Sequence, residues 1–526
     1  MVQEANEPRI YKLALTLLVA AIALAYWRSG ISQALHWDDD RFFAFVTGDG
    51  MDLKEPLVKI WTQFIEGDYI PIPLTSFWIE THLFHFHAPL IHIDNVVIHL
   101  LNVLLLIRLM QSLKLRWFSV GFVTLCFAVH PLQVEPVFWL SDRKSLLNGF
   151  GLLLALIFYR QFSSPTQEKK KSYLFAYYAA FLLACLSKAT SLLLPVAVVW
   201  FEFFIRRRRS AKPYLYQVPP MLVALAFGLL RIFALSQHVG IGSTVFFSGE
   251  RLITATLASL TAIGHYVKSF VWPAALSPFY PTYSAFPNAT GLALLGVALL
   301  IIWFTLAFRL KDRRLLGGLI FFLVFLLPVL PIFPRANFVN DRYMYIPILG
   351  ISYFAGEIIQ TIAQKIGWPL RGQYGLLAAL ALMLALSSEH QSRIWQDDQS
   401  FWESSARRIE TSALVLNNLA MNLRDRGQVE EAAITLRKAL SLPAEATAPR
   451  GALWLNLGDL YGESKWPTLF SLDTALVCYL KALESSDRPK DRQQALLRLR
   501  DVYSYLGRVS DAEAITAQLQ GQSLNQ

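Results

Sequence analysis

Charged residues are scarce in this sequence of 526 residues. Asp, Glu, Lys and Arg together make up 16% of it, whereas hydrophobic residues make up 54%. Soluble domains carry about 25% charged residues. The deficit argues against an ordinary soluble protein, and the apolar surplus indicates an integral membrane protein.

Cysteines are few and several nucleotide-binding motifs are missing. Three cysteines cannot form a disulfide framework. The sequence contains no Walker loop, no dinucleotide glycine pattern and no Gly-x-Ser-x-Gly elbow, so an ATP or nucleotide-sugar site has no support. The net charge of +10 comes from short basic clusters between apolar runs, which is typical of cytoplasmic loops. We therefore exclude nucleic acid as a partner.

Long apolar runs fill most of the first 390 residues. Each approaches the length of about 20 residues that crosses a bilayer. The runs predict an all-α, polytopic transmembrane bundle of about eleven spans, in which the first run is an uncleaved helix and not a signal peptide. The expected spans are residues 11–28, 92–110, 117–136, 145–162, 173–187, 190–206, 214–235, 291–308, 315–333, 343–363 and 374–388.

Basic clusters set the orientation of this bundle. With eleven spans they all fall on one side, which the positive-inside rule assigns to the cytoplasm. Residues 36–91 then form a first external loop, and residues 237–288 form a long external loop. The apolar run 252–272 fits badly as a span, because it would place the cluster "RLKDRR" outside. We expect it to be an interfacial or re-entrant helix.

The chain changes character after the last apolar run and becomes polar, charged and rich in alanine. "ALWLNLGDLY" places Trp454, Leu457, Gly458 and Tyr461 at the spacing of a tetratricopeptide first helix. We predict an extracytoplasmic repeat domain over residues 391–526, following a transmembrane domain of residues 1–390. Stacked helix pairs of this kind form a peptide-binding surface. A plain helical bundle is the alternative.

Three carboxylates, Asp38, Asp39 and Asp40, follow the first span on the outer face in "HWDDDRFF". Adjacent carboxylates repel each other, so one pKa should rise. A raised pKa suits a general base, or a group that orients an acceptor hydroxyl. A divalent metal between Asp38 and Asp39 is compatible with the pattern but is not demanded by it. On charge pattern alone, a solvated helix end explains the cluster equally well.

Cations lie on the same face. Lys188 stands in the helix–helix turn "SKATS", and Arg342 precedes Tyr343 in "NDRYMY". An arginine on the outer side opposes the positive-inside trend, so it needs an anion. A lipid phosphate at headgroup depth fits the forked guanidinium, with Lys188 as an added point charge. The alternative is snorkelling to ordinary headgroups.

Further polar side chains occur in and beside the apolar helices. "HPLQVEPVFWLSDRK" contains His130, Glu135 and Arg143, which form either one wall of a site or a structural ion-pair knot. His92 and His99 share one helical face. Their spacing lacks a zinc signature, so we expect a polar face that lines the site and no metal centre.

The motifs occur in a distinctive order: an acidic pair after the first helix, "YxPxPLT", "HxxNxxxH", "HPxxxEPVxWxSxRK", "SKxT", "DRYxYxPxLG" and a repeat-bearing tail. The ordered set resembles the transmembrane and tetratricopeptide-repeat-containing O-mannosyltransferases and their bacterial relatives, which belong to the GT-C glycosyltransferase superfamily. The resemblance implies a GT-C fold and transfer of a sugar from a polyprenyl-phosphate donor to a hydroxyl on the extracytoplasmic face.

The resemblance also implies roles and a location. Asp38 and Asp39 match the family's catalytic acidic pair, and Arg342, Tyr343 and Lys188 match its donor-phosphate residues. The chain would be a multi-pass protein of a bacterial inner membrane, or of the endoplasmic reticulum if eukaryotic, with periplasmic or lumenal repeats that hold an exported protein. We expect inverting transfer to Ser or Thr. The expected sugar-pocket or acceptor residues are Glu135, Arg143, His130, His92 and His99.

Four positions depart from the family pattern. Asp142 replaces a small residue, Ser145 replaces an acidic or small one, Ala189 replaces an acidic residue after Lys188, and Ile70 replaces an arginine. These positions surround the expected sugar and phosphate site, so a sugar other than mannose, such as arabinose, is an alternative. A lipid or polysaccharide acceptor is another alternative.

A different class of function is an alternative: a membrane scaffold or transporter with a repeat adaptor and no enzymatic activity. Transporters place their charges near the membrane midplane, whereas these charges are expected at the outer rim.

Overall fold

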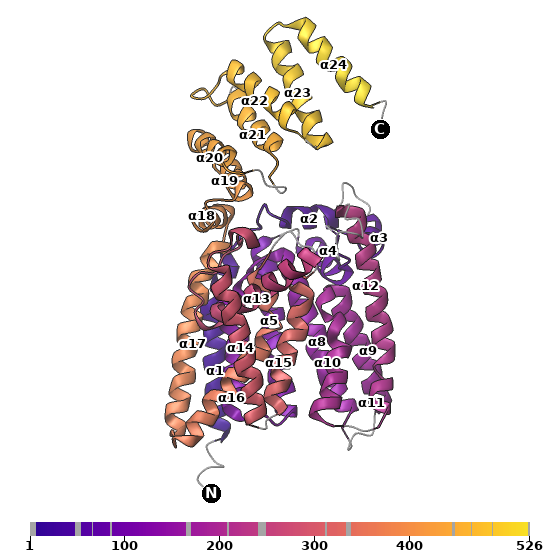
Figure 1. The fold of residues 1–526 in the computed structure, drawn as a ribbon, viewed down its shortest axis with the longest axis vertical. Helices are drawn as coiled ribbons and strands as arrows, with labels where there is room; N and C mark the ends of the chain where they lie inside the picture. The colour runs from indigo at the N-terminus through magenta and orange to yellow at the C-terminus, as the bar shows by residue number, and fades with distance from the viewer. Residues whose placement is uncertain are drawn as a thin grey trace. The chain divides into compact units, whose positions relative to one another are not determined.

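The computed structural model describes most of the chain, and its regular elements there are helices, with one isolated antiparallel bridge between Ile65 and Asp68. The all-helical expectation is therefore confirmed (Figure 1). The described residues are 7–47, 54–65, 67–84, 87–164, 170–207, 210–239, 249–310, 313–332, 338–443, 448–463, 465–486 and 488–523.

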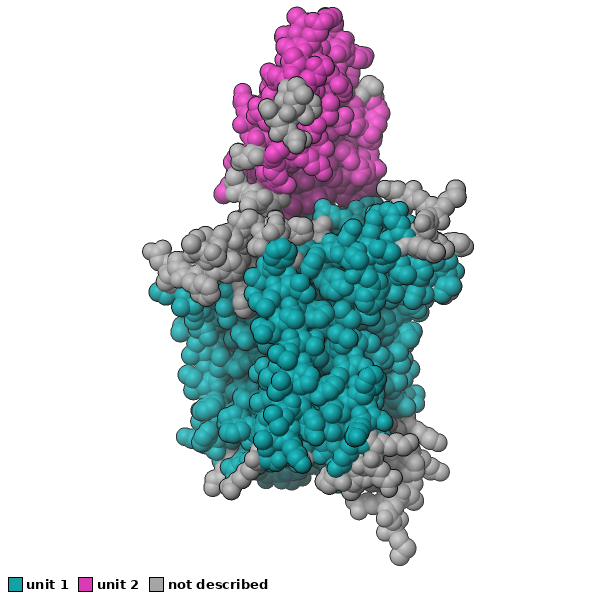
Figure 2. All heavy atoms as spheres, turned by 90° about the vertical axis from the view of Figure 1, so that its right-hand side faces the viewer, with its two compact units in different colours: residues 1–397 teal, residues 398–526 magenta. Residues whose placement is uncertain are grey.

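The chain divides into two compact units, residues 1–397 and residues 398–526, shown in teal and magenta in Figure 2. We predicted the division at residue 390. The structure keeps the end of the last long helix, α17 (Leu370–Ser392), and the 3-10 turn η10 (Arg393–Trp395) with the first unit.

The first unit is a bundle of apolar helices joined by short 3-10 and α-helical turns. Its other elements are α1 (Glu7–Tyr26), η1 (Trp27–Ile31), α2 (Asp39–Thr47), α3 (Lys54–Thr62), α4 (Pro71–Phe84), α5 (Ala88–Ser112), α6 (Trp117–Val129), η2 (Pro131–Gln133), α7 (Val134–Phe138), η3 (Leu140–Asp142), α8 (Arg143–Phe162), α9 (Lys170–Ser187), η4 (Ala189–Leu193), α10 (Leu194–Trp200), η5 (Phe201–Ile205), α11 (Lys212–Leu215), α12 (Val218–Val239), α13 (Gly249–Val271), η7 (Tyr283–Ala285), α14 (Ala289–Arg309), α15 (Arg313–Leu326), η8 (Leu327–Val329), η9 (Asp341–Met344) and α16 (Ile348–Lys365).

Each expected span overlaps a helix or a broken pair of helices in the described chain. By length and composition, five described helices can cross a membrane, or six if the bent pair Trp117–Val129 and Pro131–Phe138, with its 48° bend, is one span. Other apolar segments are interrupted, as where α10 passes into the π-helical turn η5. The protein is thus a multi-pass membrane protein, and the number eleven stays a prediction.

Helix α13 covers the run that we did not expect to span. It packs against α14 so closely that a Cβ on Gly264 would lie 1.9 Å from the Leu292 carbonyl oxygen. It is not among the described helices that are apolar enough to cross a membrane. Whether it is re-entrant or interfacial stays a prediction, and residues 240–248 of the long external loop lie outside the described residues.

In its described residues, the second unit contains one helix followed by three successive helix pairs. Positive φ angles at Gly427 (80°) and Gly507 (71°) turn the chain inside the first and third pairs. In the second pair, Gly458 lets Tyr479 pack closely, because a Cβ there would lie 2.5 Å from the Tyr479 ring. The identity of the repeats stays a prediction. The helices are α18 (Asp398–Arg408), α19 (Ala413–Asp425), α20 (Val429–Ser441), α21 (Arg450–Gly462), α22 (Leu472–Ser485), α23 (Pro489–Tyr505) and α24 (Val509–Ser523).

Candidate functional site

A short buried turn, Trp139 to Asp142, organises the candidate site. It lies between α7 and α8 and is called the central turn below. Proline fixes φ and has no amide hydrogen to donate to a helix, and Pro131 follows the end of α6. The chain from His130 to Arg143 therefore forms short, bent pieces and not one long helix, and all of these residues are buried. Such a segment can present consecutive side chains to different neighbours.

Ser141 of the central turn fixes residues 32–40, which lead from η1 into the first turn of α2 and are called the acidic loop below. The Asp39 side chain is fully buried. Its Oδ1 accepts hydrogen bonds from the Ser141 amide at 2.8 Å and the Ser141 hydroxyl at 2.5 Å, and its Oδ2 accepts one from the Leu35 amide at 3.0 Å. Burial raises the pKa of Asp39 to about 6, although the hydrogen bonds from Ser141 and Leu35 lower it. Asp39 therefore anchors the loop.

Asp38 differs from its neighbour in being only half-buried. It sits between the anchored Asp39 and Trp37, whose ring meets the ring of Phe279 edge to face at 4.8 Å. The loop is thus held on both sides of Asp38. Of the predicted acidic pair, Asp38 is the more exposed carboxylate.

Lys188, Arg342 and Tyr343 lie on one pocket, although they come from distant parts of the chain. We call it the cation pocket; it encloses about 290 Å³ of empty space, part of it open to solvent. The Lys188 Nζ donates to Asp142 Oδ1 at 3.1 Å and to Ser145 Oγ at 2.5 Å. The structure therefore brings together the three residues for which the sequence predicted phosphate binding.

Arg342 is held by an acid and by an aromatic ring. Its guanidinium pairs with Glu135, and its amide donates to Glu135 Oε2 at 2.8 Å. The guanidinium carbon also lies 4.7 Å from the centre of the Trp139 ring, in the central turn, and 5.3 Å from that of Tyr343. Glu135 thus acts by holding Arg342 in place, and the Arg342 guanidinium keeps hydrogen-bond donors for an anion in the cation pocket.

Arg143 and the predicted histidines do not line the cation pocket. Arg143 is fully buried, with its donors directed to Glu80, Asn95 (2.6 Å), the Ile91 carbonyl (2.9 Å) and Ser76 (3.4 Å). These bonds fasten α4 to α5 and α8. Arg143 thus joins three helices, and its predicted role in the sugar pocket stays a prediction.

The histidines bind backbone and side-chain atoms of the chain itself. His99 donates to the Ala128 carbonyl at 3.1 Å and accepts from Tyr345 at 3.0 Å. His130 donates to the Phe270 carbonyl at 2.9 Å. His92 donates to the Gln33 carbonyl at 3.1 Å, on the acidic loop. All three therefore hold neighbouring segments in register.

No described group of three or more His, Cys, Asp or Glu side chains could hold a metal ion. At the acidic loop, both oxygens of Asp39 already accept hydrogen bonds from Ser141 and Leu35. The suggestion of a divalent metal between Asp38 and Asp39 therefore finds no ligand set in the described residues.

Comparison with known proteins gives two long matches. The chain is 23% identical to the protein O-mannosyl-transferase F38B6.6 of Caenorhabditis elegans over 450 residues, 81% of this chain. It is 25% identical to the protein O-mannosyl-transferase TMTC1 of Homo sapiens over 509 residues, 85% of this chain. This chain resembles the protein O-mannosyl-transferases. The resemblance predicted from the order of the motifs is confirmed.

The match has limits. The chain spans 62% and 56% of the length of these two O-mannosyl-transferases. A shorter match to TMTC1 of Mus musculus is 32% identical over 178 residues, 33% of this chain and 18% of that protein. No family model matches. Two crystal structures of ArnT from Cupriavidus metallidurans, one bound to undecaprenyl phosphate and one in the apo state, are loosely similar: each has 14% identity and a TM-score of 0.38, and they cover 81% and 82% of this chain and 75% of theirs.

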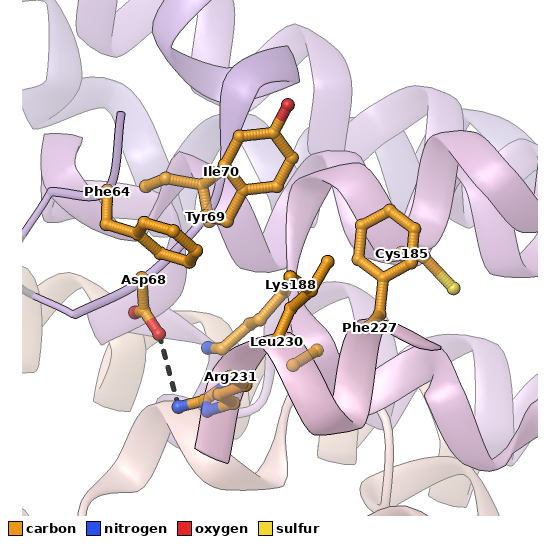
Figure 3. A pocket seen from close by; sticks show the side chains of 10 residues that line it. Phe64, Asp68, Tyr69, Ile70, Cys185, Lys188, Phe227, Leu230 and Arg231 are labelled. Carbon is orange, nitrogen blue, oxygen red and sulfur yellow. Dashed lines mark ion pairs between the residues drawn. The ribbon is translucent and has the colours of Figure 1, made fainter. Parts of the chain in front are cut away.

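Sequence reasoning missed a second pocket that also includes Lys188 (Figure 3). We call it the aromatic pocket; it encloses about 450 Å³ of empty space, part of it open to solvent. Figure 3 shows the charged groups of Asp68, Lys188 and Arg231 gathered on one side, with Tyr69 and Phe227 apart from them. Its lining residues are Phe64, Asp68, Tyr69, Ile70, Cys185, Lys188, Ala189, Phe227, Leu230 and Arg231.

Asp68 ties the aromatic pocket together electrostatically. It pairs with Arg231 at 3.1 Å and with Lys144 at 3.3 Å. Burial raises the pKa of Asp68, but Lys144 and Arg231 lower it more, to about 2. The signal for Arg231 was present in the sequence, since a lone arginine within an apolar span marks a functional candidate.

The structure explains two of the departures from the O-mannosyl-transferase pattern. Ala189 removes an acid beside Lys188, and Asp142 of the central turn supplies one at 3.1 Å. Ile70 removes an arginine, and Arg231 lines the same pocket as Ile70. A carboxylate of the central turn and a guanidinium of α12 thus lie near these two positions.

Proposed function

We propose that the chain is a GT-C glycosyltransferase that moves a sugar from a polyprenyl phosphate to a Ser or Thr hydroxyl of an exported protein. One observation carries the proposal. The central turn joins the acidic loop to the cation pocket, because Ser141 binds Asp39, Asp142 binds Lys188 and Trp139 contacts Arg342. A carboxylate loop and two cations that contact one turn suit displacement of a phosphate by a hydroxyl.

The donor would use both pockets. Its phosphate would sit in the cation pocket, where the guanidinium fork of Arg342 and the ammonium of Lys188 match its oxygens. The first isoprene units would lie against the ring of Phe227 and against Leu230 in the aromatic pocket. Lys188 lines both pockets, so one lipid phosphate can occupy them together.

The reaction would be an inverting displacement. The acceptor oxygen forms a bond to the anomeric carbon, the bond from that carbon to the phosphate oxygen breaks, and Asp38 takes the hydroxyl proton. Charge develops on the leaving phosphate, where Arg342 and Lys188 stabilise it. Asp39 and the histidines hold the loops in place, which keeps reacting groups within attack distance.

A transfer assay tests the proposal directly. Membranes containing the chain are incubated with a polyprenyl-phosphate mannose and an exported protein rich in Ser and Thr. We expect one hexose mass on the protein and an equal amount of released polyprenyl phosphate by mass spectrometry. A pentose donor tests the arabinose alternative, and transfer to lipid or polysaccharide alone would replace the protein acceptor. No transfer from any lipid-linked sugar to any of these acceptors would contradict the proposal.

The second unit would hold the protein acceptor. A chain that ends at Asp397, where the first unit ends, should glycosylate a short Ser/Thr peptide as the full chain does. Its KM for a folded protein acceptor should rise about 100-fold, because a second binding site raises the effective acceptor concentration. Equal loss with both acceptors, at equal amounts of folded protein, would instead assign the second unit a structural role.

A further inference from the structure

The segment that leads from the bundle into α18 contacts both halves of the candidate site. It comprises η10 and the two residues after it, Gln396 and Asp397, and is called the junction below. All of it belongs to the first unit. Nothing in the transfer mechanism uses this segment, yet Trp395 is buried and Gln396 is hydrogen-bonded to residues of the bundle.

The junction first contacts the acidic loop. The Gln33 amide donates to the Gln396 carbonyl at 2.8 Å, and Arg28 donates to Gln396 Oε1 at 3.0 Å. Gln33 precedes Asp38 by five residues, and its own carbonyl accepts from His92. The loop is therefore tied to the junction at Gln33 and to the central turn at Asp39. These two ties hold the chain on either side of Asp38.

The junction also contacts the residue that supports Arg342. Trp395 is 2% exposed, and its ring centre lies 6.2 Å from that of Trp139. The Trp139 ring in turn lies 4.7 Å from the Arg342 guanidinium. Tryptophan rings are large and rigid. Loss of Trp395 thus removes one of the contacts that set the plane of the Trp139 ring. Because this ring supports the Arg342 guanidinium, the position of the guanidinium changes as well.

The end of α17, which leads into the junction, is fixed to the bundle. Arg28 forms an ion pair of 2.8 Å with Glu389 near the end of α17, with both side chains mostly buried. Ser388 donates to the Val129 carbonyl at 2.8 Å. By contrast, Arg393 of η10 is more than half exposed and only pairs with Glu389, so it offers a matched control within the same turn.

We propose that Trp395 and Gln396 are positioning residues for sugar transfer: they brace the loop that carries Asp38 and the tryptophan that supports Arg342. The inference rests on the proposed function. Because the chain continues from Asp397 into α18, the junction is also the covalent route from the second unit to the site.

Full-length variants in membranes test this role with two readouts. For Trp395→Ala we expect kcat for a small Ser/Thr peptide to fall about 10- to 100-fold, as misplacement by about 1 Å can cost. Binding of undecaprenyl phosphate should weaken several-fold. Trp395→Phe should recover most of both, and Arg393→Ala should match the parent. Gln396→Ala, which loses only the bond to Arg28, should lower kcat less than Trp395→Ala.

The outcomes separate the two proposals. Parent-like kcat and parent-like lipid binding in Trp395→Ala, at equal amounts of folded protein, overturn the positioning role. Equal losses in Trp395→Ala, Trp395→Phe and Arg393→Ala overturn it as well, because they indicate general instability. If the parent itself transfers no sugar, the proposed function fails, and the lipid-binding measurements on the same variants still decide whether the junction positions Arg342.

Discussion

Asp38→Asn is expected to reduce sugar transfer by about 10²- to 10⁴-fold, the range that a general base contributes. The amide keeps the size of the side chain but cannot take the proton of the acceptor hydroxyl. Donor binding should stay near the parent value, because the phosphate contacts lie in the cation pocket. The measurement is kcat and donor KM in membranes with a short Ser/Thr peptide.

Asp40→Asn is the matched control. Asp40 belongs to the same triplet but is exposed, and its Oδ1 accepts only from the neighbouring Arg41 amide in the contacts described. We expect parent-like transfer. Near-normal turnover in Asp38→Asn would remove Asp38 from the role of base. A larger loss in Asp39→Asn than in Asp38→Asn would point to loop anchoring as the dominant contribution.

Arg342→Ala is expected to raise the donor Kd by about 10- to 100-fold, because a hydrogen bond to a charged group contributes about 1.5 to 3 kcal/mol. The chemical step should slow as well, since the leaving phosphate loses a cation. The variant also leaves Glu135 as a buried carboxylate without its partner, which costs about 3 to 5 kcal/mol in folding stability. Binding and thermal stability therefore have to be measured together.

The double variant Glu135→Gln with Arg342→Ala separates these effects. The Glu135→Gln change removes the buried negative charge, so the double variant should regain much of the stability that Arg342→Ala loses, while donor binding stays weak. If the double variant binds undecaprenyl phosphate like the parent, Arg342 serves the fold and not the phosphate. Lys188→Gln should give a smaller loss of binding, because an ammonium offers no fork.

Sequence patterns predicted the helical bundle and the three phosphate-binding candidates of the cation pocket, since apolar run length and motif order are local signals. Lys188, Arg342 and Tyr343 meet in one pocket, and their binding of a phosphate stays a prediction. Which member of the acidic pair is buried depends on Ser141, 102 residues away along the chain. Likewise, the hydrogen-bond donors of Arg143 are occupied only because α4 and α5 pack beside it.

Local patterns marked Arg231 as a candidate, because it is a lone arginine within an apolar span, but they did not predict the aromatic pocket. Asp68 and Arg231 pair although they lie far apart along the chain, and neither stands in a recognisable motif. The departures at Ala189 and Ile70 indicated that charge was missing, but not that Asp142 and Arg231 lie near those positions. Such contacts become visible only when the helices are packed, because they join residues that are far apart in the sequence.

Lys188 lies on the walls of both pockets, and this has a consequence for the catalytic cycle. Under the proposed function, the polyprenyl phosphate that remains after transfer stays bound to the Lys188 ammonium, which the incoming donor also requires. The polyprenyl phosphate and the next donor then cannot bind at the same time, so the first must leave before another turnover begins. We therefore expect release of the polyprenyl phosphate to limit the rate of each turnover.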